Sequence, residues 1–143
     1  MKNILVTIDF NANEKLLIDK AFQMAQAFNS KLWLMHVAAP NPDFIGYEAG
    51  PQSVRDSRAS ELRKEHQLIQ EYSARLKEKG IDSVSLLEQG ETIETIIEES
   101  KKLNIDLIIA GHHEHGFFYN AFTGSISAQI IKKSKIPVLI VPL

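Results

Sequence analysis

Short apolar runs alternate along this chain with longer segments of helical periodicity, and this alternation constrains the fold most. Continuous apolar runs occupy 4–8, 32–37, 106–111 and 137–143, and the run at 83–89 alternates between apolar and polar residues. Continuous runs are typical of strands that are covered on both faces, as in a parallel sheet. We therefore expect five strands, with the alternating run at an edge of the sheet.

The segments between these runs have the periodicity of amphipathic helices. Helices are predicted over 13–29, 56–79, 92–103 and 125–134. The residues expected to face inward are Leu17, Ala21, Met24, Ala25 and Phe28, then Leu62, His66, Ile69, Ser73 and Leu76, then Ile93, Ile96, Ile97 and Leu103, and finally Ile126, Ile130 and Ile131. Asn11 with Glu14 has the spacing of a capping box, and Thr92 is a candidate N-cap.

This order of strands and helices predicts an α/β fold: a parallel sheet with right-handed crossovers and helices on both faces. Ligands of such sheets bind beyond the carboxyl ends of the strands, where the strand order reverses. The residues to examine are therefore those that follow strands, namely Asp9, 37–40, Gly90 and the chain from Gly111 onward.

Composition limits the classes of function. The 143 residues are 44% hydrophobic and 24% charged, as in a globular protein, and suit one domain over 1–143. The net charge of −2 gives no reason to expect nucleic acid or an anionic membrane as a partner. Cysteine is absent, which excludes disulfides and thiolate chemistry and favours a reducing compartment. Residues 1–10 are too short an apolar run for a signal peptide, so we expect a cytoplasmic protein.

The segment GHHEHGFFYNAFTGS, residues 111–125, has features of a phosphate-binding loop. Gly124 and Ser125 open the last predicted helix, and the free amides and dipole of a helix start favour phosphate. The Ser125 hydroxyl can donate to a phosphate oxygen. It can equally cap the helix, and capping alone explains a Gly-Ser pair at this position.

The whole chain resembles the universal stress protein family. The resemblance rests on Asp9 after the first strand, on the His36-Val37 pair, on 106–111 and on the Gly-Ser helix followed by IPVLIVP. The nucleotide-binding branch of the family carries Gly, two residues, Gly, nine residues and Gly-Ser or Gly-Thr. Gly111 and Gly124-Ser125 fit this pattern, but Glu114 stands at the second glycine. The tripeptide GHH at 111–113, with which the loop begins, and the final residues IVPL at 140–143 look more like the branch that does not bind ATP.

The resemblance implies a three-layer, Rossmann-like sandwich of the adenine nucleotide alpha hydrolase type, with strand order 3-2-1-4-5. It implies AMP or ATP as a ligand, with magnesium if ATP binds. By resemblance, Asp9 would bind ribose or adenine, and Val37 would contact adenine. The other residues of the implied site are Thr7, where the family often has proline, Ala110 and Gly111, which would line the pocket, and Gly124, Ser125 and Ile126, which would hold phosphates. Asp9 could also be a turn residue, and Val37 and Ala110 could belong to the core only.

Glu114 decides how strongly a phosphate could bind. A carboxylate at about 5 Å from one phosphate charge costs roughly 3 kcal/mol at an effective dielectric of about 20, roughly a hundredfold in affinity. A magnesium ion bridging carboxylate and phosphate, or partial protonation of His112, His113 and His115, would reduce this cost. The same histidines with Glu114 could bind zinc or nickel. Adjacent residues rarely converge on one ion, so we expect no metal site.

Two aromatic segments leave alternatives open. The irregular connection 38–53 carries Phe44, Ile45 and Tyr47, and either packs on itself or covers a ligand or partner. Phe117, Phe118, Tyr119 and Phe122 follow the histidines, and either pack this loop onto the sheet or form a surface for a partner.

The last apolar run is expected to be an edge strand, and an exposed apolar edge needs a partner. The resemblance implies a homodimer through this strand, with Val138, Leu139, Ile140 and Val141 at the interface. No catalytic serine–histidine–acid set or carboxylate pair is specified by the sequence. Three functions remain: a nucleotide-binding sensor, a ligand-free dimeric scaffold with unknown protein partners, and a slow nucleotide hydrolase.

Overall fold

The computed structural model describes residues 1–39, 52–113 and 125–143. Strands and helices alternate strictly in this part of the chain, as predicted. The elements are β1 (Asn3–Thr7), α1 (Glu14–Phe28), β2 (Lys31–Ala38), α2 (Gln52–Glu78), β3 (Ser83–Gln89), α3 (Thr92–Lys102), β4 (Leu107–His112), α4 (Ile126–Lys133) and β5 (Val138–Pro142).

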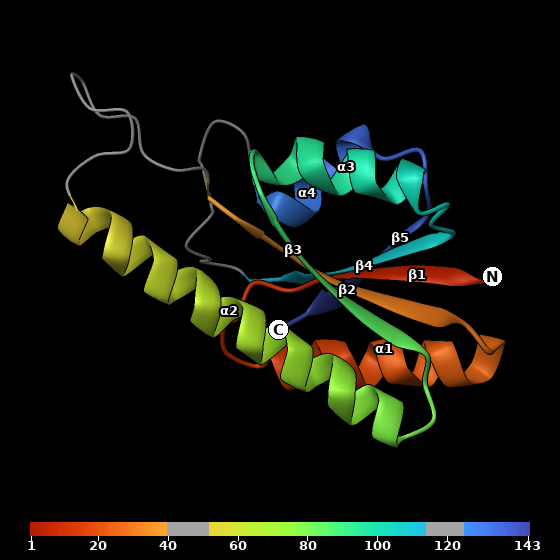
Figure 1. Ribbon diagram of the computed structural model, residues 1–143. Coiled ribbons are helices and arrows are strands. Elements are labelled where there is room, and N and C mark those ends of the chain that lie inside the picture. The colour runs from red at the N-terminus through yellow and green to blue at the C-terminus, as the bar shows by residue number, and fades with distance from the viewer. Residues whose placement is uncertain (40–51, 114–124) are drawn as a thin grey trace.

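The five strands form one parallel sheet with the order β3-β2-β1-β4-β5. This confirms the expected topology, including the edge positions of the alternating run (β3) and of the last strand (β5). Helices α1 and α2 cover one face of the sheet, and α3 and α4 cover the other (Figure 1). Strand β1 lies at the centre, between β2 and β4, so the chain reverses its winding direction there and ligand sites are expected beyond its carboxyl end.

Two hydrophobic cores flank the sheet, and β1 contributes to both. Ile4 and Val6 pack toward α1 and α2, whereas Leu5 packs toward α3 and α4, and none of the three is exposed to solvent. Successive side chains of a strand point to opposite faces, so a strand buried on both sides must be apolar at every position. This is why the runs are continuous in the sequence.

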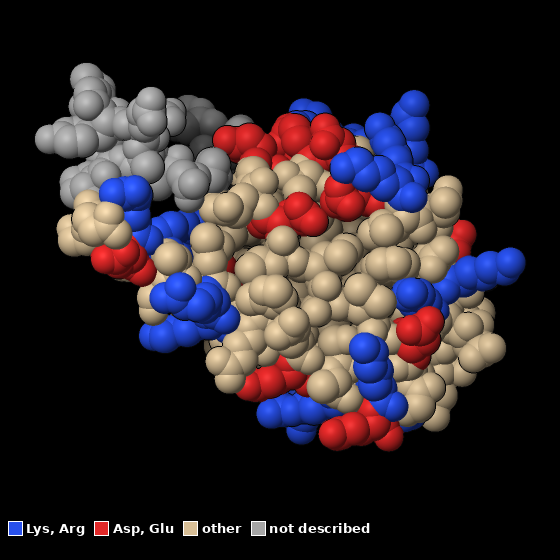
Figure 2. All heavy atoms as spheres, viewed as in Figure 1, with Lys and Arg blue, Asp and Glu red and all other residues tan. Residues whose placement is uncertain are grey.

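Helix α2 departs most from its prediction. It begins at Gln52 rather than 56, and its buried residues are Ile69, Ser73 and Leu76, all in the C-terminal half. His66 is exposed, so its expected place on the inner face was wrong. The N-terminal half extends beyond the body of the molecule in Figure 1, and lysine and arginine side chains gather on it in Figure 2. None of its described residues is buried, so this half has no apolar side that packs in the core.

Two other predicted inward-facing residues are also exposed. Phe28 is 52% exposed and Ile131 is 57% exposed. Phe28 is the last residue of α1, directly before the left-handed turn at Asn29. Ile131 follows the buried Ile130 in a helix of 8 residues, and a step of one residue rotates a side chain by about 100° away from its neighbour.

Of the three predicted helix caps, only Ser125 is confirmed, since its hydroxyl accepts the Ala128 N–H at 3.2 Å. The N-cap of α1 is Asn13, in a left-handed conformation, rather than Asn11. The N-cap of α3 is Glu91, and Thr92 is the first helical residue. None of the described helices combines the length and the apolar character needed to cross a membrane.

Candidate functional site

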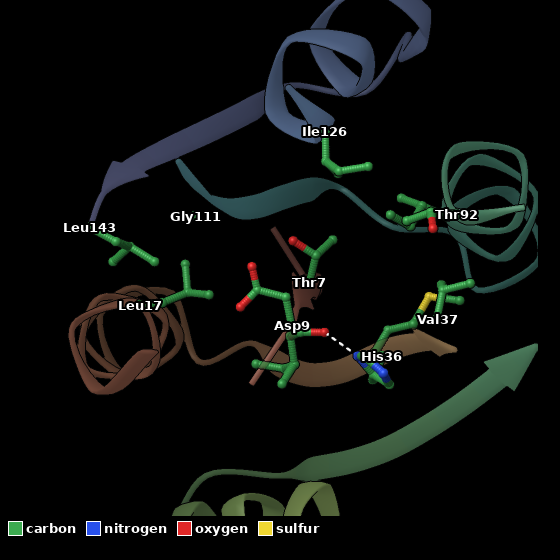
Figure 3. Close-up of a pocket in the computed structure, with 12 residues that line it drawn as sticks. Thr7, Asp9, Leu17, His36, Val37, Thr92, Gly111, Ile126 and Leu143 are labelled. Carbon is green, nitrogen blue, oxygen red and sulfur yellow. Dashed lines mark hydrogen bonds between the residues drawn. The ribbon is translucent and has the colours of Figure 1, made fainter. Parts of the chain in front are cut away.

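A cavity of about 50 Å³ lies at the carboxyl ends of the central strands, where the topology predicts a ligand site. Figure 3 shows Asp9 in its middle, with Leu17 and Leu143 on one side and Thr92 and Ile126 on the other. The residues that line it are Thr7, Ile8, Asp9, Leu17, Met35, His36, Val37, Thr92, Ile96, Gly111, Ile126 and Leu143.

The cavity brings together most of the residues that the resemblance indicated. Those that line it are Thr7, Asp9, Val37, Gly111 and Ile126. Ala110 is buried in β4 and does not line the cavity. Ser125 stands beside Ile126 as the N-cap of α4. Glu114 and Gly124, like His115, the aromatic residues 117–122 and most of the connection 38–53, lie outside the described residues.

The turn after β1 is held by Glu14, which the sequence indicated only as part of a capping box. Its Oε1 accepts the N–H groups of Asp9 and Phe10 at 2.9 and 3.0 Å, and Tyr72 donates its hydroxyl to Oε2 at 3.2 Å. Phe10 has a φ of 59°, a left-handed conformation that is unfavourable for a bulky residue. The buried carboxyl group therefore fixes a strained turn that carries Asp9 into the cavity.

Burial raises the pKa of the Glu14 carboxyl above its ordinary value, although the backbone N–H groups of Asp9 and Phe10 oppose this shift. Burial also raises the pKa of the Tyr72 hydroxyl, and the negative charge of Glu14 adds to the effect. Burial therefore disfavours ionisation of the Glu14 carboxyl group. The Tyr72 hydroxyl stays protonated and donates its hydrogen bond to Glu14.

His36 ties β2 to the end of β1. Its Nδ1 lies 2.7 Å from the Ile8 carbonyl oxygen, which can only accept, so Nδ1 carries the proton of this hydrogen bond. The ring packs on Phe10 at 4.6 Å between centroids. Its Nε2 lies 3.5 Å from Oε2 of Glu65 in α2. In the sequence, His36 contributed only to the family resemblance. In the structure, it connects the wall of the cavity to α2.

The two described histidines after β4 turn to different partners. His112 Nδ1 lies 2.8 Å from Ser127 Oγ, which in turn lies 2.9 Å from Ser125 Oγ. His113 Nε2 lies 3.5 Å from Asp9 Oδ2. The two rings therefore do not converge on one ion. No group of three potential metal-ligating side chains occurs within residues 1–39, 52–113 and 125–143.

Gly111 permits a close approach of the chain end. A Cβ atom at this position would overlap Leu143 Cδ1 and lie 3.8 Å from Leu17 Cδ2. The Leu143 N–H also donates to the His112 carbonyl at 3.0 Å, which holds the last residue beside the end of β4. Leu17 and Leu143 thus close one side of the cavity. Nothing in the spacing of the sequence indicated Leu143, Leu17 or Thr92 as site residues.

The chain is similar to known proteins over almost its whole length. The model of the universal stress protein family matches residues 1–142. Universal stress protein A of Escherichia coli strain K12 is 28% identical over 99% of this chain and 94% of the relative.

Two solved structures share the fold. UspA from Lactobacillus plantarum superposes with a TM-score of 0.82 at 17% identity, covering 98% of this chain and 97% of that chain. A universal stress protein family member from Arabidopsis thaliana, with AMP bound, superposes with a TM-score of 0.66 at 16% identity, covering 99% and 92%. The match to the family model over nearly the whole chain, with the sheet order and the cavity just described, shows that this chain belongs to the universal stress protein family.

Proposed function

We propose that this protein is a dimeric stress-response sensor or scaffold that binds an adenine nucleotide at the cavity beyond β1, β2 and β4. The observation that carries the proposal is the convergence of Asp9, Val37, Gly111 and Ile126 on one cavity. These residues come from four segments that are distant in the sequence. The AMP-bound relative from Arabidopsis thaliana has the same fold and supports this choice of ligand.

The proposed roles follow from the chemistry of each side chain. The Asp9 carboxylate can accept hydrogen bonds from ribose hydroxyls or from the adenine amino group. Val37 offers an apolar surface to the base. The start of α4, with Ser125 at its N-cap, favours a phosphate through its backbone amides and dipole. AMP carries less negative charge than ATP and would need no magnesium ion to offset it.

A second candidate is a nucleotide-free dimeric scaffold, and the size of the cavity favours it. Ligand pockets usually enclose about 300–1,000 Å³, whereas this cavity has about 50 Å³. Leu17 and Leu143, which close one side of the cavity, would have to move before a nucleotide could enter. In this case the stress response would act through protein partners of the dimer.

The dimer itself is proposed on the edge strand β5. Among the described residues this strand pairs only with β4, and Val138, Leu139 and Ile140 are half-buried while Val141 is buried. An apolar edge with free backbone groups tends to pair with another strand. Antiparallel pairing with the β5 of a second copy would cover it.

We propose no catalytic activity beyond a slow, incidental hydrolysis of ATP. The Ser127 hydroxyl faces the His112 ring, but no described carboxylate contacts that ring to complete a catalytic triad. A cytoplasmic location is proposed because the chain has no cysteine and suits a reducing compartment.

Titration calorimetry with AMP and with ATP, each with and without magnesium, tests the proposed ligand. Micromolar binding that is lost in Asp9→Ala supports the nucleotide sensor. A matched control is Asp82→Ala, because Asp82 is an exposed carboxylate at the opposite end of the sheet and should leave binding unchanged. No heat at millimolar nucleotide would exclude the sensor and leave the dimeric scaffold.

A further inference from the structure

We propose that His113 is a built-in competitor of the nucleoside: its imidazole occupies Asp9 in the free protein and must leave before ribose or adenine can bind there. The inference rests on the proposed function. It concerns the second of the two residues that follow Gly111 in the glycine pattern, a position to which the pattern assigns no role, and it predicts an effect of protons on ligand binding.

The geometry brings the two side chains together from neighbouring strands. Asp9 follows β1 and His113 follows β4, and these strands lie side by side at the centre of the sheet. The Nε2–Oδ2 distance is 3.5 Å, and the side chains are 20% and 33% exposed, respectively. This is an ion-pair distance rather than a short hydrogen bond, so the contact gains most when the imidazole is charged.

Asp9 has little freedom to serve both partners at once. Its Oδ1 accepts the Asn11 N–H at 3.0 Å, and its own N–H is bound by Glu14. The second oxygen, Oδ2, is the one that faces His113. A ribose hydroxyl or an adenine amino group that approaches Oδ2 would therefore enter the space in which the imidazole lies.

The imidazole is itself incompletely satisfied. His113 Nε2 is buried and has no hydrogen-bond partner among the described residues. A buried polar atom without a hydrogen-bond partner costs free energy. The ring is thus held near Asp9 without being fixed there, as displacement by a ligand requires.

The other titratable groups around the cavity, among the residues that the structure describes, are engaged in other contacts. Glu14 binds the backbone of the β1–α1 turn, and burial raises the pKa of its carboxyl group. His36 bonds the Ile8 carbonyl and faces Glu65, and His112 faces Ser127. The described parts of α3 and α4 that line the cavity, at Thr92, Ile96 and Ile126, carry no charge. Protonation of His113 therefore acts on Asp9.

The sign of the effect follows from this arrangement. Histidine is the side chain whose charge ordinarily changes between pH 5 and 8. A charged ring holds Asp9 more tightly, so a nucleoside binds less well. A neutral ring is displaced more easily. For partly exposed pairs, measured coupling corresponds to a change of about two- to fivefold in an equilibrium constant.

Adenosine is the probe for this test because it has no phosphate, so attraction between histidines and phosphate does not enter. Calorimetry at pH 6 and pH 8 should show adenosine binding the wild type about two- to fivefold more weakly at pH 6. His113→Ala should bind more tightly than the wild type at pH 6, with an affinity that is the same at both pH values. His66→Ala is the matched control, because His66 is exposed on α2, and it should retain the pH dependence of the wild type.

A second measurement reads the contact in the free protein. In protein labelled with ¹⁵N-histidine, Asp9→Asn should move the ring nitrogen signals of His113 and leave those of His66 unchanged. Unmoved His113 signals would overturn the proposal. So would equal adenosine affinities of the wild type and His113→Ala at both pH values, or weaker binding by His113→Ala, which would make the ring a ligand contact. If neither protein binds adenosine, this inference fails, and the titration with AMP and ATP decides the proposed function separately.

Discussion

Glu14 shows how one buried side chain sets the geometry of the site. Its carboxylate accepts two backbone N–H groups of the turn that carries Asp9, and it receives the Tyr72 hydroxyl from α2. The turn includes Phe10 in a left-handed conformation, which costs free energy unless the surroundings enforce it. The position of Asp9 is therefore a consequence of Glu14.

Glu14→Ala should lower the free energy of unfolding by about 2–4 kcal/mol, because it leaves the partly buried N–H groups of Asp9 and Phe10 without their acceptor. Glu14→Gln should cost less than about 1 kcal/mol, since its amide oxygen can still accept both N–H groups. Urea denaturation at pH 7 measures both variants. Equal losses in the two variants would show that the hydrogen bonds to the turn are not what Glu14 contributes.

The wild type and Glu14→Gln should also differ in how their stability depends on pH. The pKa of Glu14 is raised in the folded state, so the native protein binds this proton more tightly than the unfolded chain does. Its contribution to stability is therefore fully present below about pH 4.5, the ordinary value, and is lost as the pH rises through the raised pKa. The stability of the wild type relative to Glu14→Gln should fall over this range. A difference that is constant with pH, or that rises, would contradict the assignment.

Gly111 makes a second prediction at the scale of single residues. Gly111→Ala places a Cβ against Leu143 Cδ1 and should cost about 1–3 kcal/mol of unfolding free energy through overpacking. Leu143→Ala in the same chain should recover part of this loss. A double-mutant cycle by thermal or urea denaturation measures the coupling between the two positions, and strictly additive losses would show that Leu143 does not limit the space at Gly111.

At the scale of elements, α2 has two halves with different roles. None of its described residues from 52 to 68 is buried, whereas Ile69, Ser73 and Leu76 pack on the sheet. The N-terminal half is held by polar contacts, such as the Arg58 guanidinium on the Ala39 carbonyl. Most of the stability of the helix must therefore come from its C-terminal half, since packing of an apolar face stabilises helices more than propensity does.

Neighbouring residues of α2 offer a matched test of this division. Ile69 is fully buried and Leu68 is 40% exposed. Ile69→Ala should cost about 2–5 kcal/mol of unfolding free energy, because it removes buried methyl groups and leaves a cavity. Leu68→Ala should change it by about 0.5 kcal/mol. Denaturation midpoints of the two variants check the contrast, and similar losses would mean that the helix packs on a different face.

At the scale of the whole molecule, the proposed dimer depends on the free edge of β5. The Leu143 N–H points to β4, and amide directions alternate along a strand, so the N–H of Ile140 points to the free edge. Pro142 is also at a position whose N–H would point to the free edge. Because proline has no N–H, it is tolerated there without the loss of a hydrogen bond between β5 and β4. The backbone of β5 thus has its open side where a second copy would pair.

Sedimentation of the wild type should give twice the 16.1 kDa mass of the chain. Ile140→Pro should shift the protein toward monomer, because it removes the outward N–H at the centre of the proposed pairing while keeping the hydrogen bonds to β4. Ile140→Ala is the control, since it shortens the same side chain but retains that N–H, and it should remain a dimer. A monomeric wild type, or a dimeric proline variant, would exclude pairing through β5.

The sequence by itself determined the strands, the helices and their order along the chain. Strands that are buried on both faces require continuous apolar runs, and helices that are buried on one face require apolar residues at helical spacing, so both patterns are local. The sequence also predicted that Asp9 and Gly111 lie at the carboxyl ends of strands of one parallel sheet. It did not determine which side chains meet there. The contacts of Glu14 with Tyr72, His113 with Asp9, His112 with Ser127 and Gly111 with Leu143 join residues from different elements. Only the tertiary structure decided these contacts, since the ends of parallel strands bring together residues whose separation in the sequence carries no periodic signal.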